Sequence, residues 1–243
     1  MKQHIISFAL GNIWSWIPSR NMGTLVDFAR QLDISGVEIT LASKDELFSF
    51  QLSEEDRTWL RALAHVTIHA PFRLISESAN QKELLSQLHL LSELYQSINA
   101  KTIVIHPDEM PEPGLLQQHA FTVSTENMPE GRFSVQSNLN HLMSRYPGID
   151  LCIDVSHAFL ISGKETAQLI SAFSNKISQI HLSGADAASD HLSLRNAPRE
   201  FLRSIRPIKT LQVPMVLEAD IRIMNIEYLK EEIEYIKHFL YTP

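Results

Sequence analysis

Short apolar segments alternate with longer segments of helical periodicity along the chain. The apolar segments have the length of buried strands, and prolines end two of them, at Pro71 and Pro107. This pattern predicts strands at residues 5–10, 37–41, 65–72, 102–107, 119–129, 150–159, 177–184 and 213–220. Apolar residues with helical spacing predict helices at residues 22–32, 53–64, 80–98, 134–146, 164–176, 198–205 and 226–240. Ser53, followed three positions later by Asp56, is expected to cap the second of these helices.

Alternating strands and helices indicate a parallel sheet. Eight such units in 243 residues match a closed (β/α)₈ TIM barrel, which we expect to be a single domain spanning residues 1–243. An open, doubly wound sheet is the alternative, but no glycine-rich dinucleotide fingerprint follows any predicted strand. The fourth unit is irregular, because three prolines in residues 107–119 leave room for one or two helical turns. We therefore expect a degenerate fourth helix.

Composition indicates a chain that can bury a large core, and the net charge is an argument against a nucleic-acid-binding surface. Hydrophobic residues make up 44% of the chain, and the formal net charge is −7. No run of Lys and Arg provides a phosphate-binding stripe, although a metal ion could carry positive charge locally. Cys152 is the only cysteine, so no intramolecular disulfide is possible and a cytoplasmic location is expected. The N-terminal segment predicts a strand rather than a signal peptide, and no apolar run reaches the roughly 18 residues of a membrane span.

Acidic and imidazole side chains recur where the predicted strands end. In a barrel the carboxyl ends of all strands lie at one mouth, where active sites are built. The strand-end residues are Glu38, His69, His106, Glu126, Asp154 with His157 just beyond, His181 with Asp190 and His191 in the following loop, and Glu218.

Carboxylates that converge in this way repel one another unless a cation neutralises them. Mixed imidazole and carboxylate ligands suit Zn²⁺, Mn²⁺ or Fe²⁺, so the sequence predicts a divalent metal site. Any single histidine at a strand end can equally cap a backbone group or face water, and Glu38 can equally form a surface ion pair. Trp14 and Phe72 either line the mouth or belong to the core.

Several motifs together resemble the xylose isomerase-like TIM barrels. They are "IVIHP", "STENMP", "IDVSHAF", "IHLSGAD", "DHLSL" and "VLEAD", in matching order over nearly the whole chain. That superfamily contains sugar and sugar-phosphate isomerases and epimerases as well as phosphodiesterases of the endonuclease IV type.

The resemblance implies that Glu126, Asp154, His181 and Glu218 are the metal quartet shared by the superfamily. It also implies that His69, His106, His157 and His191 are further ligands of an endonuclease IV-like trinuclear site. One metal site is therefore expected and up to three are possible, with Zn or Mn as the ion. Ser189 stands where that trinuclear site has an aspartate, and Asp190 is next to it. Glycines that are common in the loop after His191 are replaced by Arg195 and Ala197.

Two reaction classes fit this resemblance. In an isomerase or epimerase acting through an enediolate, Glu126 and Glu218 would move protons on opposite faces of the substrate carbon. Arg222 and Arg195 are candidates to bind a phosphate, and Glu38, Trp14 and Phe72 are further candidate substrate contacts. In a phosphodiesterase, two or three metals would generate hydroxide and neutralise the phosphate.

The sequence analysis narrowly favours the isomerase or epimerase, because Ser189 and Arg195 weaken the case for a third metal. The expected partner is a small carbohydrate or phosphorylated substrate, with no nucleic acid and no membrane. A barrel that has lost catalysis is a third interpretation, which the intact quartet argues against. The shortened fourth helix leaves an apolar gap that suggests a homo-oligomer.

Overall fold

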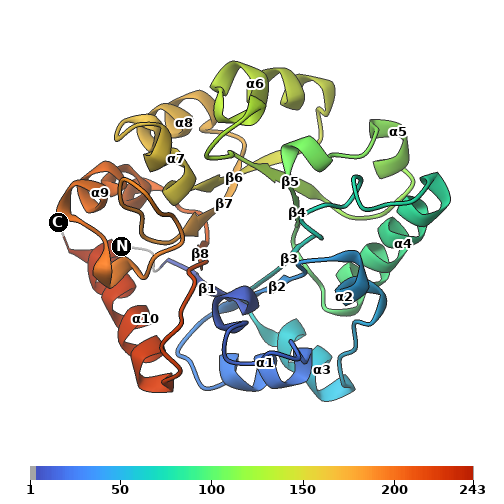
Figure 1. Ribbon diagram of the computed structural model, residues 1–243, viewed down its shortest axis with the longest axis horizontal. Coiled ribbons are helices and arrows are strands. Elements are labelled where there is room, and N and C mark those ends of the chain that lie inside the picture. The colour runs from blue at the N-terminus through green and yellow to red at the C-terminus, as the bar shows by residue number, and fades with distance from the viewer. Residues whose placement is uncertain (1–3, 243) are drawn as a thin grey trace.

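The computed structural model describes residues 4–242 and shows a closed barrel of eight parallel strands. Each strand pairs with the next in sequence order, and β8 pairs with β1 to close the barrel (Figure 1). The strands are β1 Ile6–Ala9, β2 Gly36–Thr40, β3 His65–His69, β4 Ile103–Ile105, β5 Val123–Glu126, β6 Asp150–Asp154, β7 Ile177–Leu182 and β8 Met215–Leu217. The predicted TIM barrel is confirmed, and the open doubly wound sheet is excluded.

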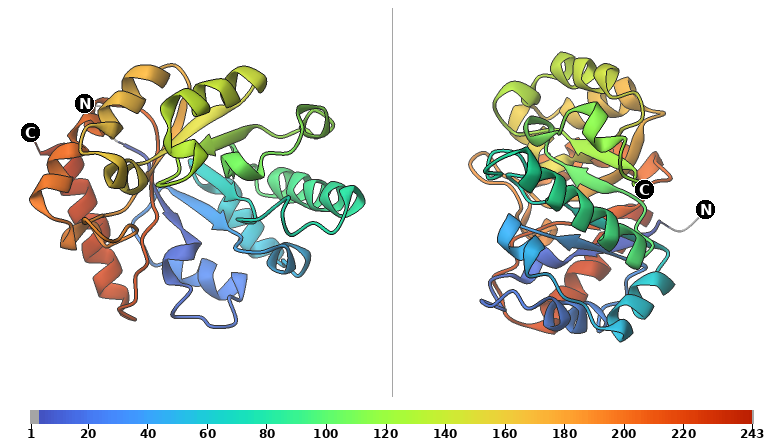
Figure 2. Two further views of the ribbon diagram at one scale, coloured as in Figure 1. Left: turned by 45° about the horizontal axis from the view of Figure 1, so that its top comes forward. Right: turned by 90° about the vertical axis from the view of Figure 1, so that its right-hand side faces the viewer.

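The helices surround the strands on the outside of the barrel (Figure 2). They are α1 Met22–Ala29, α2 Lys44–Phe48, α3 Glu54–Ala62, α4 Gln81–Ser97, α5 Pro113–Leu116, α6 Gln136–Arg145, α7 Val155–Ile161, α8 Glu165–Phe173, α9 Arg199–Ser204 and α10 Ile226–Tyr241. The 3₁₀ helices are η1 Leu10–Ile13, η2 Pro107–Glu109, η3 Arg132–Ser134, η4 Leu194–Asn196 and η5 Arg206–Thr210. No helix in the described part of the chain is both long enough and apolar enough to cross a membrane.

The irregular fourth unit matches the prediction. Between β4 and β5 the chain forms only η2 and the four-residue α5, each with a proline in its first turn. Proline is tolerated there because the first helical N–H groups have no partner within the helix.

The segment 150–159 was predicted as one strand, and this prediction is wrong in its second half. Strand β6 ends at Asp154, and the helix α7 begins at Val155. The Asp154 carboxylate accepts a hydrogen bond from the His157 backbone N–H at 2.8 Å, so it is the N-cap of α7. This short helix turns His157 back toward the barrel mouth.

The predicted cap of α3 is present. Ser53 Oγ accepts a hydrogen bond from Asp56 N at 3.1 Å, and Asp56 Oδ2 accepts one from Ser53 N at 3.2 Å. This reciprocal pair is a capping box, and Asp56 also forms a 2.8 Å ion pair with Arg30 of the neighbouring segment.

The barrel interior below the mouth is polar. Glu38, Thr67 and Gln179 are fully buried there. Thr67 Oγ1 and Gln179 Nε2 each donate a 2.9 Å hydrogen bond to Glu38 Oε2, and Gln179 Oε1 lies 2.9 Å from His65 Nε2. The apolar core lies mainly between the strands and the surrounding helices. It includes Phe8, Leu25, Leu88 and Phe201.

Asn12 in η1 connects the first and last strands where the barrel closes. Its buried side-chain amide donates a 2.7 Å hydrogen bond to Leu217 O at the end of β8 and another to Ala9 O at the end of β1. Its side-chain oxygen accepts a hydrogen bond from Ala219 N. Asn12 thus satisfies backbone groups of the first and last strands where they meet.

We expect Asn12→Ala to lower the free energy of unfolding by about 2–4 kcal/mol, because it leaves buried backbone groups without partners. Urea denaturation would measure the loss. Asn138→Ala is the matched control, since Asn138 donates a single exposed hydrogen bond to Arg132 O, and it should cost about 1 kcal/mol or less. Equal losses in the two variants would contradict the role assigned to Asn12.

Candidate metal centre

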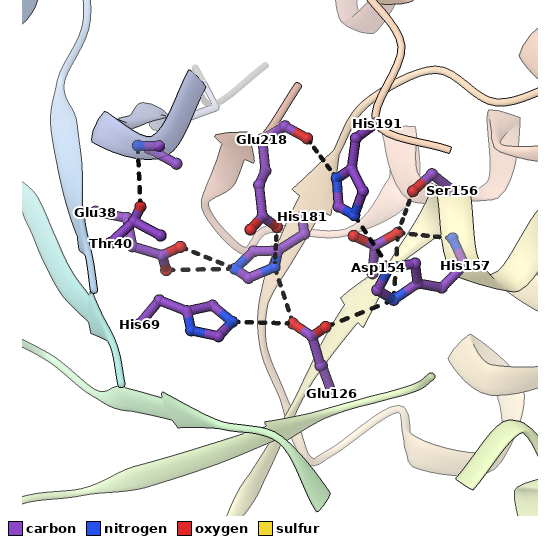
Figure 3. Close-up of polar contacts among 12 residues, drawn as sticks. Glu38, Thr40, His69, Glu126, Asp154, Ser156, His157, His181, His191 and Glu218 are labelled. Carbon is purple, nitrogen blue, oxygen red and sulfur yellow. Dashed lines mark hydrogen bonds and ion pairs between the residues drawn. The ribbon is translucent and has the colours of Figure 1, made fainter. Parts of the chain in front are cut away.

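The strand ends bring acidic and imidazole groups together around one cavity of about 510 Å³ at the barrel mouth. Figure 3 shows acidic and imidazole side chains pointing toward one another from several strands, from α7 and from the segments that follow β7 and β8. Seven residues named from the sequence line the cavity: His69, Phe72, His106, Glu126, His157, His191 and Glu218.

His181 lies at the centre of the first group of possible ligands. Its Nδ1 atom is 3.1 Å from Glu126 Oε2 and 2.5 Å from Glu218 Oε2, but neither approach has the geometry of a hydrogen bond. Its Nε2 atom lies 3.2 Å from Glu38 Oε1, on the opposite side of the ring. Because a carboxylate accepts and does not donate, Glu38 favours a proton on Nε2, so a neutral His181 ring would direct its Nδ1 lone pair toward Glu126 and Glu218.

His69, His106 and Glu126 form the second group. The Nε2 atoms of both histidines lie 3.8 Å from oxygens of Glu126. His69 Nδ1 donates a 2.9 Å hydrogen bond to the Ala70 carbonyl, which can only accept. The His69 Nε2 lone pair is therefore directed into the cavity.

Asp154, His157 and His191 form a third group. His157 Nδ1 donates to Asn127 O and His191 Nδ1 donates to Glu218 O, each at 2.9 Å. Both rings thus direct Nε2 at each other, and these two atoms are only 3.1 Å apart. Two neutral rings held this way would oppose their lone pairs, so either a proton or a cation must lie between them.

Three atoms at the centre that could bind a metal have no hydrogen-bond partner within the described residues. Glu126 Oε2, Asp154 Oδ2 and His181 Nδ1 are buried and make no hydrogen bond. Burying such groups is costly unless they are paired or bind a metal. Carboxylate oxygens and imidazole nitrogens are ligands of Zn²⁺ and Mn²⁺, so the residues present fit a divalent cation. The four predicted quartet residues do not form one group: His181 groups with Glu126 and Cys152 and also with Glu38 and Glu218, whereas Asp154 groups separately with His157 and His191.

Neighbouring charges shift the pKa values of the buried groups at this centre. Burial opposes a charge on His181, but the carboxylates of Glu218 and Glu38 outweigh burial and raise the pKa of His181 well above its usual value. Burial likewise opposes ionisation of Glu126, but His181 and His69 lower the pKa of Glu126 well below the usual range. For His191, the charges of Asp154 and Glu218 overcome burial and raise the pKa to about 9.

Cys152 lies behind this site and was considered from the sequence only for disulfides. Its side chain is fully buried and groups with Glu126 and His181. Burial raises the pKa of the Cys152 thiol to about 12, so it is protonated at neutral pH and is no nucleophile.

Four candidate substrate contacts lie outside the cavity lining. Glu38 is fully buried behind His181, because it precedes the end of β2 by two residues and points into the polar interior. The Trp14 ring lies under the Arg20 guanidinium in a neighbouring pocket. Arg195 pairs with Glu231 at 2.8 Å, and Arg222 pairs with Asp220 at 2.6 Å. None of these four predicted substrate contacts lines the cavity of the metal centre, and Phe72 is the one of the five that does.

Sequence reasoning missed part of the cavity lining and the groups that hold its loops. The missed lining residues are Arg73, Ser76, Asp108, Glu109, Met128 and Pro129. Most of them follow β3, β4 or β5 by a few residues, and this position after a strand end was the available signal.

The loop that carries His191 is held by a buried carboxylate from α10. Glu232 accepts hydrogen bonds from Ser193 Oγ at 2.6 Å and Leu194 N at 2.5 Å. His191 itself has a φ of 49°, a conformation that non-glycine residues rarely adopt and that surrounding contacts must stabilise. Glu232 thus helps to keep the His191 ring beside His157.

Comparison with known structures supports this arrangement at the level of the fold. Endonuclease IV from Thermus thermophilus superimposes with a TM-score of 0.64 at 17% identity, covering 95% of this chain and 99% of that one. A D-tagatose 3-epimerase-like protein gives a TM-score of 0.65 at 15% identity, with 96% and 98% covered. A xylose isomerase-like TIM barrel protein from Mycobacterium smegmatis in complex with magnesium gives 0.62 at 14% identity, with 99% and 98% covered.

The fold is that of the xylose isomerase-like TIM barrels. No protein-family model matches the sequence, and neither does any curated protein. The similar structures include both an endonuclease and epimerases, so the xylose isomerase-like fold alone does not select a reaction.

We expect metal binding to release protons and to strengthen as the pH rises. Nearby carboxylates raise the pKa of both His181 and His191, so protonation of these rings competes with metal binding, and a metal ligand must lose that proton. Affinity should therefore fall as the pH drops below about 9, the pKa of His191. Zinc titration calorimetry in buffers of different ionisation enthalpy would count the protons released.

His191→Gln should release fewer protons than the wild type, whereas the exposed His238→Gln in α10 should not differ from it. Zinc affinity that does not change with pH would contradict the charge state assigned to these rings.

Proposed function

We propose that this barrel is a divalent-metal-dependent phosphoester hydrolase that holds two or three metal ions and acts on a small phosphorylated substrate. The observation that carries the proposal is the third ligand group, in which His157 Nε2 and His191 Nε2 face each other at 3.1 Å beside Asp154. A single ion held by Glu126, His181 and Glu218 gives these two rings no ligand role. The geometry thus favours the reaction class that the sequence analysis placed second.

Asp190 supports the third group. It stands one residue from the position where the endonuclease IV-like pattern has its aspartate, and its Oδ2 atom lies 3.9 Å from His157 Nε2. Asp190 can therefore take the ligand role that Ser189 cannot.

Side chains around the cavity have positions that suit such a hydrolase. Divalent ions in such a site acidify water and offset the charge of a phosphate ester. Glu126 contacts both the His69–His106 group and His181, so it would link neighbouring ions. Phe72 stacks on His106 with ring centroids 5.5 Å apart and gives the cavity an apolar wall on that side. The net charge of −7 favours a small substrate over a nucleic-acid duplex.

An isomerase or epimerase acting on a carbohydrate or sugar phosphate is the second candidate. Glu126 Oε2 and Glu218 Oε2 approach the same nitrogen of His181, which is the arrangement expected around a single ion. The two carboxylates would then also move protons at the substrate carbon, provided that one oxygen of each stays free.

We expect the zinc-loaded protein to contain two or three ions per chain and to hydrolyse bis(4-nitrophenyl) phosphate or a phosphomonoester. Glu126→Gln should lower activity by about 100-fold or more, because it removes a shared ligand charge. Elemental analysis and a chromogenic assay would measure both quantities.

Asp220→Asn is the matched control. Asp220 follows Glu218 by two residues but pairs with Arg222 outside the ligand groups, so this variant should keep its metals and its activity. One ion per chain together with interconversion of ketoses or sugar phosphates would favour the second candidate. A protein without bound ions or either activity would contradict both.

A further inference from the structure

One cationic side chain at the cavity takes no part in the ligand groups. Arg73 lines the cavity and is the only lysine or arginine among the residues that do. It is exposed, and no ion pair or side-chain hydrogen bond involves it within residues 4–242. Arg222 and Arg195, the two arginines suggested by the sequence, are in contrast already paired with carboxylates.

The loop that carries Arg73 is held firmly in place. Glu109 accepts hydrogen bonds from Ile75 N at 2.6 Å, Ser76 N at 2.8 Å and Ser76 Oγ at 2.7 Å. Lys44 Nζ donates to Glu77 O at 2.8 Å, and the buried Gln87 donates to Ser78 Oγ at 2.7 Å. An arginine on a fixed loop loses less conformational freedom when it binds a ligand.

The neighbours of Arg73 show which ligand this position suits. Phe72 packs against His69 and His106, so the loop presents an aromatic ring and a guanidinium side by side at the edge of the candidate metal centre. The guanidinium fork matches the oxygens of a phosphate. Asp108 also lines the cavity, and its carboxylate would repel an anion there. Within the described residues Asp108 forms no ion pair with Arg73.

We propose that Arg73 recognises a phosphate group of the substrate and restricts the cavity to phosphorylated molecules. The inference rests on the proposed function, since the same cavity must hold the reacting group. Arg73 is a specificity residue that contacts the non-bridging oxygens of the phosphate, and Glu109 is the positioning residue that holds its loop.

Inorganic phosphate is the probe, titrated by calorimetry into the zinc-loaded protein at low ionic strength. Arg73→Met should weaken phosphate binding by about tenfold or more, and Arg73→Lys should restore part of the loss, because lysine keeps the charge without the fork. Asp108→Asn should strengthen binding, because it removes an opposing charge. Arg222→Met is the control for an exposed arginine near the mouth, and it should bind phosphate as the wild type does.

Binding by Arg73→Met within about twofold of the wild type, or an equal loss in Arg222→Met, would overturn the inference. Weaker phosphate binding by Asp108→Asn would also overturn the inference. That variant removes a negative charge from the cavity, so it should act in the opposite direction to Arg73→Met. Zinc content, measured on each preparation, separates this outcome from a damaged metal centre.

Hydrolysis of the chromogenic ester by the same preparations separates the inference from the proposed function. Phosphate binding that depends on Arg73 in a protein without hydrolysis would overturn the hydrolase and leave the phosphate site standing. Hydrolysis by a protein whose phosphate binding does not depend on Arg73 would overturn the phosphate site and leave the hydrolase standing.

Discussion

The contact between Glu126 and His181 is the constraint on which the rest of the site depends. Both side chains are buried near the carboxyl ends of β5 and β7, and Glu126 Oε2 lies 3.1 Å from His181 Nδ1. A buried carboxylate is stable only with a compensating positive charge. Protonated histidines can supply that charge, and under the proposed function a divalent cation would replace their protons. Such an exchange of protons for a metal ion would account for the many polar groups that are buried at the barrel mouth.

The sequence predicted this centre because strand ends are easy to recognise. Glu126, Asp154 and His181 are the final or near-final residues of β5, β6 and β7, and the closed barrel brings those ends together. Glu38 could not be placed this way, because β2 continues for two residues beyond it and its side chain points into a deeper layer. The length of β6 was also misjudged, since a carboxylate that ends a strand can equally begin a helix, and Asp154 does both.

Arg73 was not predicted from the sequence, for a different reason. The loop after β3 has no pattern that fixes its shape, and its conformation depends on Glu109, which lies 33 and 34 residues away in sequence from the groups that it binds. The loop after β7 is similar, because Glu232 of α10 holds it from 38 and 39 residues away. Strand-borne ligands follow from local periodicity, whereas loop-borne residues are positioned by buried carboxylates that pair only once the chain has folded.

The difference between strand-borne and loop-borne residues suggests how one barrel can support different reactions. The strand-borne carboxylates and His181 could serve either an isomerase or a hydrolase, as expected of a fold shared by both. Under the proposed function and the proposed role of Arg73, loop-borne groups would decide between them: His191 and Asp190 after β7 would set whether a further ion is held, and Arg73 after β3 would set which substrate charge is accepted. Because Glu109 and Glu232 fix those loops without touching the strand-borne ligands, the loops can change reaction and substrate while the buried centre stays intact.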